Sequence, residues 1–102
     1  PHDEGAMSQR QFILVVYDIS NDKRRTKLHN ALLDFGTPVQ YSVFECLLTE
    51  KDVARLKQAV MKVIRPRTDR VRFYSLCASC VAKVEVTSGV EVLRENSQTI
   101  VV

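Results

Sequence analysis

The segment Phe12-Ile13-Leu14-Val15-Val16-Tyr17-Asp18 decides how this chain folds. Its unbroken run of aliphatic and aromatic residues is typical of a β-strand that is buried on both faces. The strand ends in a carboxylate, and it is followed by the polar turn Ile19-Ser20-Asn21-Asp22 and the basic stretch Lys23-Arg24-Arg25-Thr26-Lys27. A carboxylate at the mouth of a buried strand, beside a positively charged helix start, suits a metal ion that handles a phosphodiester.

Two amphipathic helices are predicted after this strand. Residues 22–35 place apolar side chains at helical spacing, Asn21 or Asp22 can cap the start, and Gly36 is a natural stop. Residues 50–64 repeat the pattern behind an acidic first turn, which favours a second helix. Each helix therefore has one apolar face to bury against a sheet.

Three further extended segments are predicted from their content of β-branched and aromatic residues and from alternation of apolar and polar positions. We expect strands over residues 39–48, with a bend or a break near Glu45, over residues 70–76, and over residues 81–86.

This order of elements favours an α+β fold, with the helices on one face of a largely antiparallel sheet. A ferredoxin-like βαββαβ sandwich with an extra C-terminal strand is the economical choice. The first strand is apolar on both faces, yet two helices cover only one face of a sheet. We therefore expect a two-fold homodimer, in which a second copy of the chain covers the other face.

A chain of 102 residues has the size of one domain. Residues 1–6 are polar and without periodicity, and we expect them to be a leader or the remnant of a tag. Residues 7–88 are expected to form the ferredoxin-like domain. Residues 89–102 hold two weak extended runs, and we expect this C-terminal segment to dock on the partner copy or on another protein.

Composition limits the classes of function. The net charge is +3 with 15 lysine and arginine residues, which permits nucleic-acid binding without proving it. The longest apolar run, residues 12–17, is far shorter than the roughly 20 residues that a membrane helix needs, so no membrane partner is expected. Three cysteines are an odd number, which argues against a closed disulfide framework and for the reducing cytoplasm.

Cys77 and Cys80 form a C-x-x-C motif. A zinc site needs four ligands, and the chain has no second cysteine pair at zinc-ribbon spacing. A thioredoxin-like site places the motif at a helix start after a strand, whereas a strand is expected to follow the motif here. A reduced turn is the simplest interpretation, and a disulfide and a metal site are the alternatives.

Two stretches together resemble a known family. They are Tyr17-Asp18-Ile19-Ser20-Asn21-Asp22-Lys23-Arg24-Arg25 and, after Gly36, Val39-Gln40-Tyr41-Ser42-Val43-Phe44-Glu45. At this separation they resemble the CRISPR-associated endoribonuclease family called Cas-two, the small protein of the CRISPR spacer-acquisition pair. The resemblance covers roughly residues 12–86. Either stretch alone would be a weak signal.

The resemblance implies a ferredoxin-like homodimer, a divalent-metal nuclease activity on RNA or double-stranded DNA in some members, and a partnership with the larger CRISPR integrase. It implies that Asp18 is the metal-binding and catalytic residue, with Mg²⁺ as the cofactor. It also implies nucleic-acid contacts at Tyr17, Arg25, Lys27, Ser42 and Phe44. Some members carry an arginine just before the second stretch, where this chain has Pro38.

Each of these residues also has a plain structural interpretation. Asp18 suits a turn or a helix cap as well as a metal. Tyr17 and Phe44 suit core packing, and Ser42 suits a tight or half-exposed position in a sheet.

Two basic sets are candidates for contacts with a nucleic-acid backbone. The first lies at the start of the first helix, where Arg24, Arg25 and Lys27 fall within about one and a half turns, at 3.6 residues per turn. A helix N-terminus adds its own positive potential there. The second set follows the second helix and consists of Arg65, Arg67, Arg70 and Arg72. A solvated charged surface is the alternative for both sets.

The sequence therefore predicts a metal-dependent endonuclease of CRISPR spacer acquisition and antiviral defence. Two copies of Asp18 would meet at a two-fold axis and share one Mg²⁺, because one carboxylate holds this ion poorly. The first alternative is a non-catalytic dimeric scaffold that binds duplex DNA and bridges integrase subunits. The second is a ribonuclease toxin of similar fold.

Overall fold

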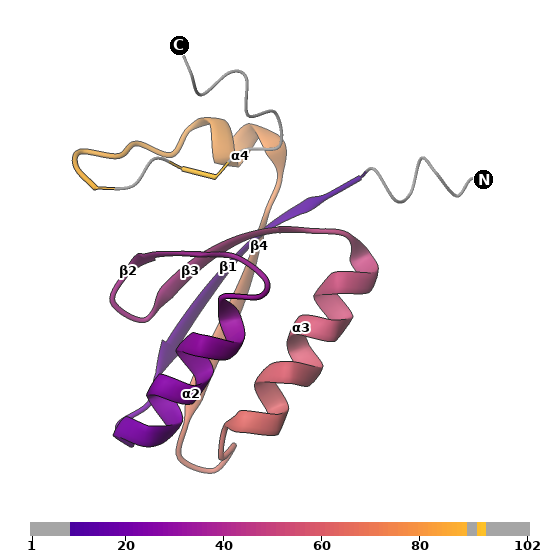
Figure 1. Cartoon of the computed structure of the whole chain (residues 1–102). Coiled ribbons are helices and arrows are strands. Elements are labelled where there is room, and N and C mark those ends of the chain that lie inside the picture. Colours follow the sequence, from indigo (N-terminus) through magenta and orange to yellow (C-terminus); the bar gives the residue numbers. More distant parts are fainter. Residues whose placement is uncertain (1–8, 90–91, 94–102) are drawn as a thin grey trace.

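The computed structural model describes residues 9–89 and 92–93. Figure 1 shows a sheet with two long helices, α2 and α3, side by side against one face and a short helix, α4, near one end of the sheet. The elements in chain order are β1 (Gln11–Asp18), α2 (Asp22–Leu32), β2 (Thr37–Gln40), β3 (Val43–Leu48), α3 (Glu50–Val63), β4 (Arg70–Leu76) and α4 (Ala78–Ala82). The predicted α+β, ferredoxin-like architecture is confirmed.

The strand β1 lies in the middle of the sheet. The strand order is β2-β3-β1-β4, and every neighbouring pair is antiparallel. Val15 at the centre of β1 pairs with Phe44 on one side and Phe73 on the other. A central strand loses water from both faces and both edges, which is why residues 12–16, between Tyr17 and the exposed Gln11, are all apolar.

Both long helices begin at side-chain caps. The Asn21 side chain accepts a hydrogen bond from the backbone N–H of Arg24 at 2.9 Å, and Thr49 caps α3 through the N–H of Asp52 at 3.3 Å. Such caps satisfy amide groups that the helix itself leaves without partners. The helix α2 ends at Leu32, three residues before the predicted end, because the chain tightens into a turn in which the Gly36 N–H bonds to the Leu32 carbonyl.

The main core lies between the sheet and the two long helices. Ile13, Val15 and Tyr17 of β1 point into it and are all nearly or fully buried. Leu28 and Leu32 of α2 and Leu56 and Val60 of α3 meet them there, as the helical periodicity predicts.

The opposite side, which we call the distal face, is covered at one end by the chain itself. Phe12 of β1 packs there with Val81 and Val92, and all three are buried. Val16, further along β1, is only half-buried on the same face. Among the described residues, the half of the distal face around Phe12 is thus covered. The half that ends at Asp18, which we call the open half, is half-buried at Val16 and exposed at Asp18.

The strand predicted over residues 81–86 is wrong. Residues 78–82 form α4, and residues 83–89 have no regular structure. Val81 points into the cluster around Phe12, whereas Val84 and Val86 stay 37% exposed beside an open hollow of about 310 Å³ on the distal face. Alternation in the sequence does not make a strand where no neighbouring strand offers hydrogen bonds.

The predicted break in the second extended segment is confirmed, but its position is different. The chain turns at Tyr41 and Ser42, between β2 and β3, and Glu45 lies inside β3. Ser42 has a φ of 64°, a left-handed conformation that a turn of this kind requires. The leader expected at residues 1–6 lies outside the described residues, and so does most of the docking segment expected at residues 89–102, of which 89, 92 and 93 are described.

Gly36 provides a test of how tightly the turn after α2 packs on β3. A Cβ atom at this position would overlap the carbonyl oxygen of Glu45 and the Sγ atom of Cys46. We expect Gly36→Ala to lower the free energy of unfolding by about 1–3 kcal/mol, because backbone and a buried side chain cannot move aside cheaply. Urea unfolding measures the loss. Gln58→Ala on the exposed face of α3 is the control, and equal stability of the two variants would contradict the packing argument.

Candidate active site at the end of the central strand

The strand β1 ends in an exposed carboxylate at Asp18. Asp18 pairs with Arg70 of β4, and Val16 pairs with Arg72. Residues that pair directly across antiparallel strands project from the same face. Asp18 and both arginines, all exposed, therefore lie on the open half of the distal face. One carboxylate and two guanidinium groups therefore lie on the same surface. Guanidinium groups bind phosphate through charge-assisted hydrogen bonds, so this surface suits a phosphate group.

One protomer does not complete a metal site. Within the described residues, no group of three His, Cys, Asp or Glu side chains lies close enough to hold a metal ion. Mg²⁺ takes six oxygens and keeps several waters, so a single carboxylate holds it poorly. Asp18 therefore fits a magnesium site only where a second copy or a substrate phosphate adds oxygens.

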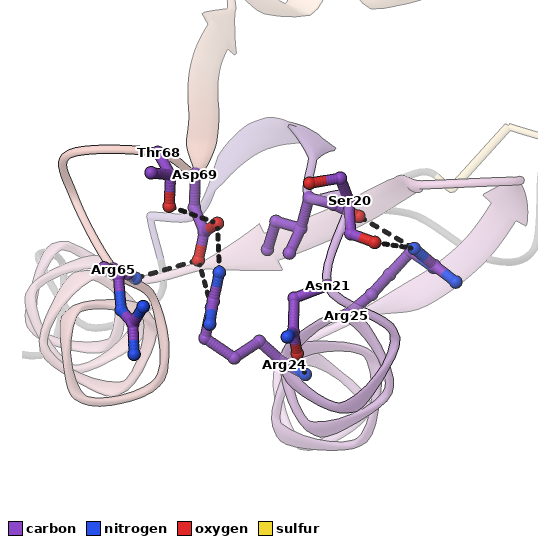
Figure 2. Close-up of polar contacts among 8 residues, drawn as sticks. Ser20, Asn21, Arg24, Arg25, Arg65, Thr68 and Asp69 are labelled. Atoms are coloured by element: carbon purple, nitrogen blue, oxygen red, sulfur yellow. Dashed lines mark hydrogen bonds and ion pairs between the residues drawn. The ribbon is translucent and has the colours of Figure 1, made fainter.

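Arg25 braces the loop that follows Asp18. Its Nη1 donates to the carbonyl oxygen of Ile19 at 2.8 Å, and its Nη2 pairs with Asp22. Figure 2 shows the side chain reaching back from α2 to these carbonyls. The guanidinium group also lies 5.9 Å from the ring centre of the exposed Tyr41. Arg25 therefore holds the backbone of the loop that leads from Asp18 to α2.

Arg24 is tied to the start of β4 by a two-point ion pair with Asp69. Its Nε and Nη2 donate to the two carboxylate oxygens at 2.7 and 3.0 Å (Figure 2). Asp69 also accepts from the backbone N–H of Arg65 at 2.8 Å and from the Thr68 hydroxyl at 3.2 Å. The hydrogen bonds from Arg24, above all, hold the pKa of the Asp69 carboxyl at about 2. This cluster anchors the residue next to Arg70, so Arg24 acts on the site through the backbone of β4.

The other predicted contact residues lie on the helix-covered side of the sheet. Phe44 is fully buried, 5.1 Å from the His29 ring and 6.4 Å from the Tyr17 ring. This burial agrees with its core interpretation, and its contact with nucleic acid stays a prediction. Tyr17 is only 5% exposed, and burial raises the pKa of its hydroxyl. Ser42 is half-buried, and its carbonyl accepts the Tyr17 N–H at 3.0 Å.

A small hollow of about 220 Å³ gathers three of the predicted residues. Tyr17, Arg25 and Ser42 line it, together with Tyr41 and His29 of the same region. Lys27 lies one turn along α2 from Lys23, at the border of a shallow hollow on the outer surface of that helix. The predicted residues are thus not gathered at one place. Asp18 lies on the distal face, Tyr17, Arg25 and Ser42 line the hollow beside α2, and Phe44 lies in the core. Arg24 is paired with Asp69, and Lys27 lies on the outer surface of α2.

Comparison with known proteins identifies the family. The family model for CRISPR associated protein Cas2 matches residues 11–84. The chain belongs to the Cas2 family. A CRISPR-associated endoribonuclease Cas2 from Chloroflexus aurantiacus is 42% identical over 76 residues, which are 74% of this chain and 82% of that protein.

Solved Cas2 structures share the fold. Cas2 from Streptococcus pyogenes superposes with a TM-score of 0.68 at 32% identity and covers 76% of this chain and 99% of its own. A chain of a partial Cas6-RT-Cas1–Cas2 complex superposes with a TM-score of 0.64 at 28% identity, and the match covers 76% of this chain and 90% of that one. No helix in the described part of the chain is long and apolar enough to cross a membrane.

Two features of this Cas2 site were not predicted from the sequence. Asp69 gave no signal, because an aspartate after Thr68 in a short loop looks like an ordinary turn residue. The placement of Arg70 beside Asp18 follows only from the register of β1 against β4. The basic set had been recognised, but its relation to the carboxylate depends on strand order, which sequence periodicity does not encode.

The ion pair between Arg24 and Asp69 should make the stability of the fold depend on pH in the acidic range. Because the Asp69 pKa falls from its usual 3.8 to about 2 on folding, the pair stabilises the protein fully above pH 4, and the stabilisation is lost as the pH falls toward 2. We expect Asp69→Asn to lower the free energy of unfolding at pH 7. We also expect the free energy of unfolding of this variant to fall less steeply between pH 4 and pH 2. Urea unfolding across this range measures it. Asp34→Asn, at an exposed position, is the control, and an unchanged acid slope in Asp69→Asn would refute the assignment.

Proposed function

We propose that this Cas2 family member is a homodimeric, Mg²⁺-dependent endonuclease that hydrolyses phosphodiester bonds of RNA or double-stranded DNA in CRISPR spacer acquisition. The observation that carries the proposal is the exposed Asp18 carboxylate on the open half of the distal face, directly across from Arg70. The names of the related endoribonucleases support the activity. The complex that contains Cas1 and Cas2 supports the partnership with the integrase.

The open half of the distal face is the proposed dimer interface. Val16 and Val43 pair across β1 and β3, and both are only half-buried. Tyr74 of β4 lies beside them and is 40% exposed. Apolar surface of this kind is a candidate for contact with a second copy. Such a contact around a two-fold axis near Val16 brings two Asp18 carboxylates toward each other.

The residues of this chain have separate roles in the proposed site. Asp18 from each copy holds the ion, and Mg²⁺ when bound supplies a Lewis acid that polarises a phosphoryl oxygen. Arg70 and Arg72 hold the phosphate from the same face, and Lys27 contacts the backbone further along. Arg24 and Arg25 are positioning residues, because their guanidinium groups are committed to Asp69 and to the loop after Asp18.

A scaffold function is the second candidate. One specific observation favours it: the described residues of one protomer contain no group of three His, Cys, Asp or Glu side chains that could hold a metal ion. In this alternative the dimer grips a DNA duplex and bridges integrase subunits without cutting. The same cationic surface would serve, since phosphate contacts position a duplex regardless of its sequence.

Asp18→Asn separates the two candidates. The amide keeps the size of the side chain but loses the charge that holds a divalent cation. We expect Mg²⁺-dependent cleavage of RNA or duplex DNA to fall roughly 100-fold or more, with dimerisation and nucleic-acid binding retained. Cleavage assays with Mg²⁺ and with a chelator, together with a spacer-integration assay, give the readout.

Two further variants complete this experiment. Asp34→Asn removes an exposed acid elsewhere and should cleave normally. Val16→Arg places a charge in the open half of the distal face and should give an inactive monomer by light scattering. A monomer that cleaves at the full rate would refute the shared site. Loss of cleavage with intact integration in Asp18→Asn would show that the scaffold function does not need the carboxylate.

The phosphate contacts predict a dependence on salt. We expect each of the variants Arg70→Ala, Arg72→Ala and Lys27→Ala to bind nucleic acid more weakly, by a factor that does not depend on the nucleotide sequence. Each should also lower the slope of log affinity against log salt by about 0.7 to 0.9 per lost contact. Fluorescence anisotropy with labelled RNA and DNA measures the slope. Lys51→Ala, in the first turn of α3, is the matched control, and slopes equal to that of the parent in all three variants would overturn this surface.

A further inference from the structure

Cys77 and Cys80 lie where the chain leaves β4 and enters α4. Both are exposed and reduced, and Cys77 is the residue that precedes the first turn of the helix. The expectation of a following strand, which spoke against redox chemistry at this motif, is removed by the presence of α4. The structure has a strand, then the two cysteines in one turn, and this order is the one that a dithiol site uses.

The sulfur of Cys77 has a hydrogen-bond partner within the same turn. It lies 3.2 Å from the Ser79 hydroxyl oxygen, and either atom can donate. Interaction with the Ser79 hydroxyl, followed by that with Cys80, lowers the pKa of the Cys77 thiol to about 7. The interaction between the two cysteines raises the pKa of the Cys80 thiol, because its proton is held by the Cys77 sulfur.

We propose that Cys77 and Cys80 form a redox-active pair, in which Cys77 is the attacking sulfur, Cys80 is the resolving sulfur, and low-molecular-weight disulfides are the oxidants. The assignment rests on three observations: the two cysteines lie three residues apart at the junction of β4 and α4, the Cys77 sulfur lies 3.2 Å from the Ser79 hydroxyl oxygen, and both cysteines are exposed and free. A lower thiol pKa distinguishes an attacking thiol from its resolving partner.

The reaction balances with one disulfide molecule. The Cys77 thiolate attacks one sulfur of the oxidant, a mixed disulfide forms, and the first small thiolate leaves. The Cys80 thiol then gives up its proton and attacks the Cys77 sulfur, so that the intramolecular disulfide forms and the second small thiolate leaves. Two protein thiols are oxidised, and the oxidant is reduced to two thiols, which take up the released protons.

The pair is placed to act on the segment that covers the distal face. Val81, directly after Cys80, is buried against Phe12, and its backbone N–H donates to the Cys77 carbonyl at 3.0 Å. The disulfide would close the same turn covalently. Oxidation would therefore add a covalent link to the turn that precedes Val81, whereas in the reduced structure a backbone hydrogen bond closes this turn.

Cys46 provides an internal control. It is fully buried in the main core, and burial raises the pKa of its thiol to about 11. In the folded protein it should neither be alkylated nor exchange with disulfides at neutral pH. Any fast-reacting thiol therefore belongs to the pair at α4.

The test is exposure of the purified full chain to glutathione disulfide, followed by alkylation and mass spectrometry of peptides. We expect the loss of two hydrogens in the peptide that contains both cysteines, with the chain still unlinked to other chains. In Cys80→Ser we expect a stable mixed disulfide at Cys77, because no resolving thiol remains. In Cys77→Ser the oxidation should be lost.

Rates of alkylation at pH 7 give the second measurement. A thiol whose pKa is about 7 rather than 9 should react roughly sixfold faster, after its lower intrinsic nucleophilicity is counted. We expect Cys77 to show this advantage and Ser79→Ala to reduce it. Equal rates at Cys77 and Cys80, or a disulfide that joins two chains instead of closing the turn, would overturn the proposal.

Discussion

The burial of β1 on both faces is the constraint on which the rest of the structure depends. A strand with Ile13 and Val15 on one side and Phe12 and Leu14 on the other must lie in the middle of a sheet and be covered twice. The two long helices provide one cover. Val81 of α4, with Val92 and Leu93, covers the end of the other face around Phe12, and among the described residues Asp18 stays exposed. The position of the carboxylate at an open surface is thus a consequence of how far that second cover extends.

Arg24 and Arg25, which are neighbours in α2, hold two different segments of backbone in place. Arg24 reaches across to Asp69 and fixes the backbone just before Arg70, whereas Arg25 turns back and fixes the backbone just after Asp18. The two segments that carry the proposed acidic and basic groups are therefore held from the same turn of α2. A pair of arginines that look from the sequence like surface contacts for phosphate instead set the geometry on which such contacts depend. Arg–carboxylate pairs with two parallel hydrogen bonds are well suited to this, because they fix orientation as well as distance.

The sequence predicted most of the fold because most of it is encoded locally. The apolar stripe of α2, the caps at Asn21 and Thr49 and the continuous apolar run of β1 each specify their element without help from distant residues. The strand expected over residues 81–86 failed for the opposite reason, since a strand exists only where a neighbour pairs with it. Phe44 shows the same limit at the site, because its motif identifies the family while its burial depends on the packing of α2 against the sheet.

The incompleteness of the site in one chain connects the chemistry to the assembly. A divalent cation needs more oxygens than Asp18 offers, and the apolar side chains of Val16 and Val43 are only half-buried by the described part of the chain. One event, the approach of a second copy to the open half of the distal face, would meet both needs. The two requirements are linked by the pleat of β1, since Val16 and Asp18 are two residues apart and must project from the same face. Any partner that buries the first therefore approaches the second.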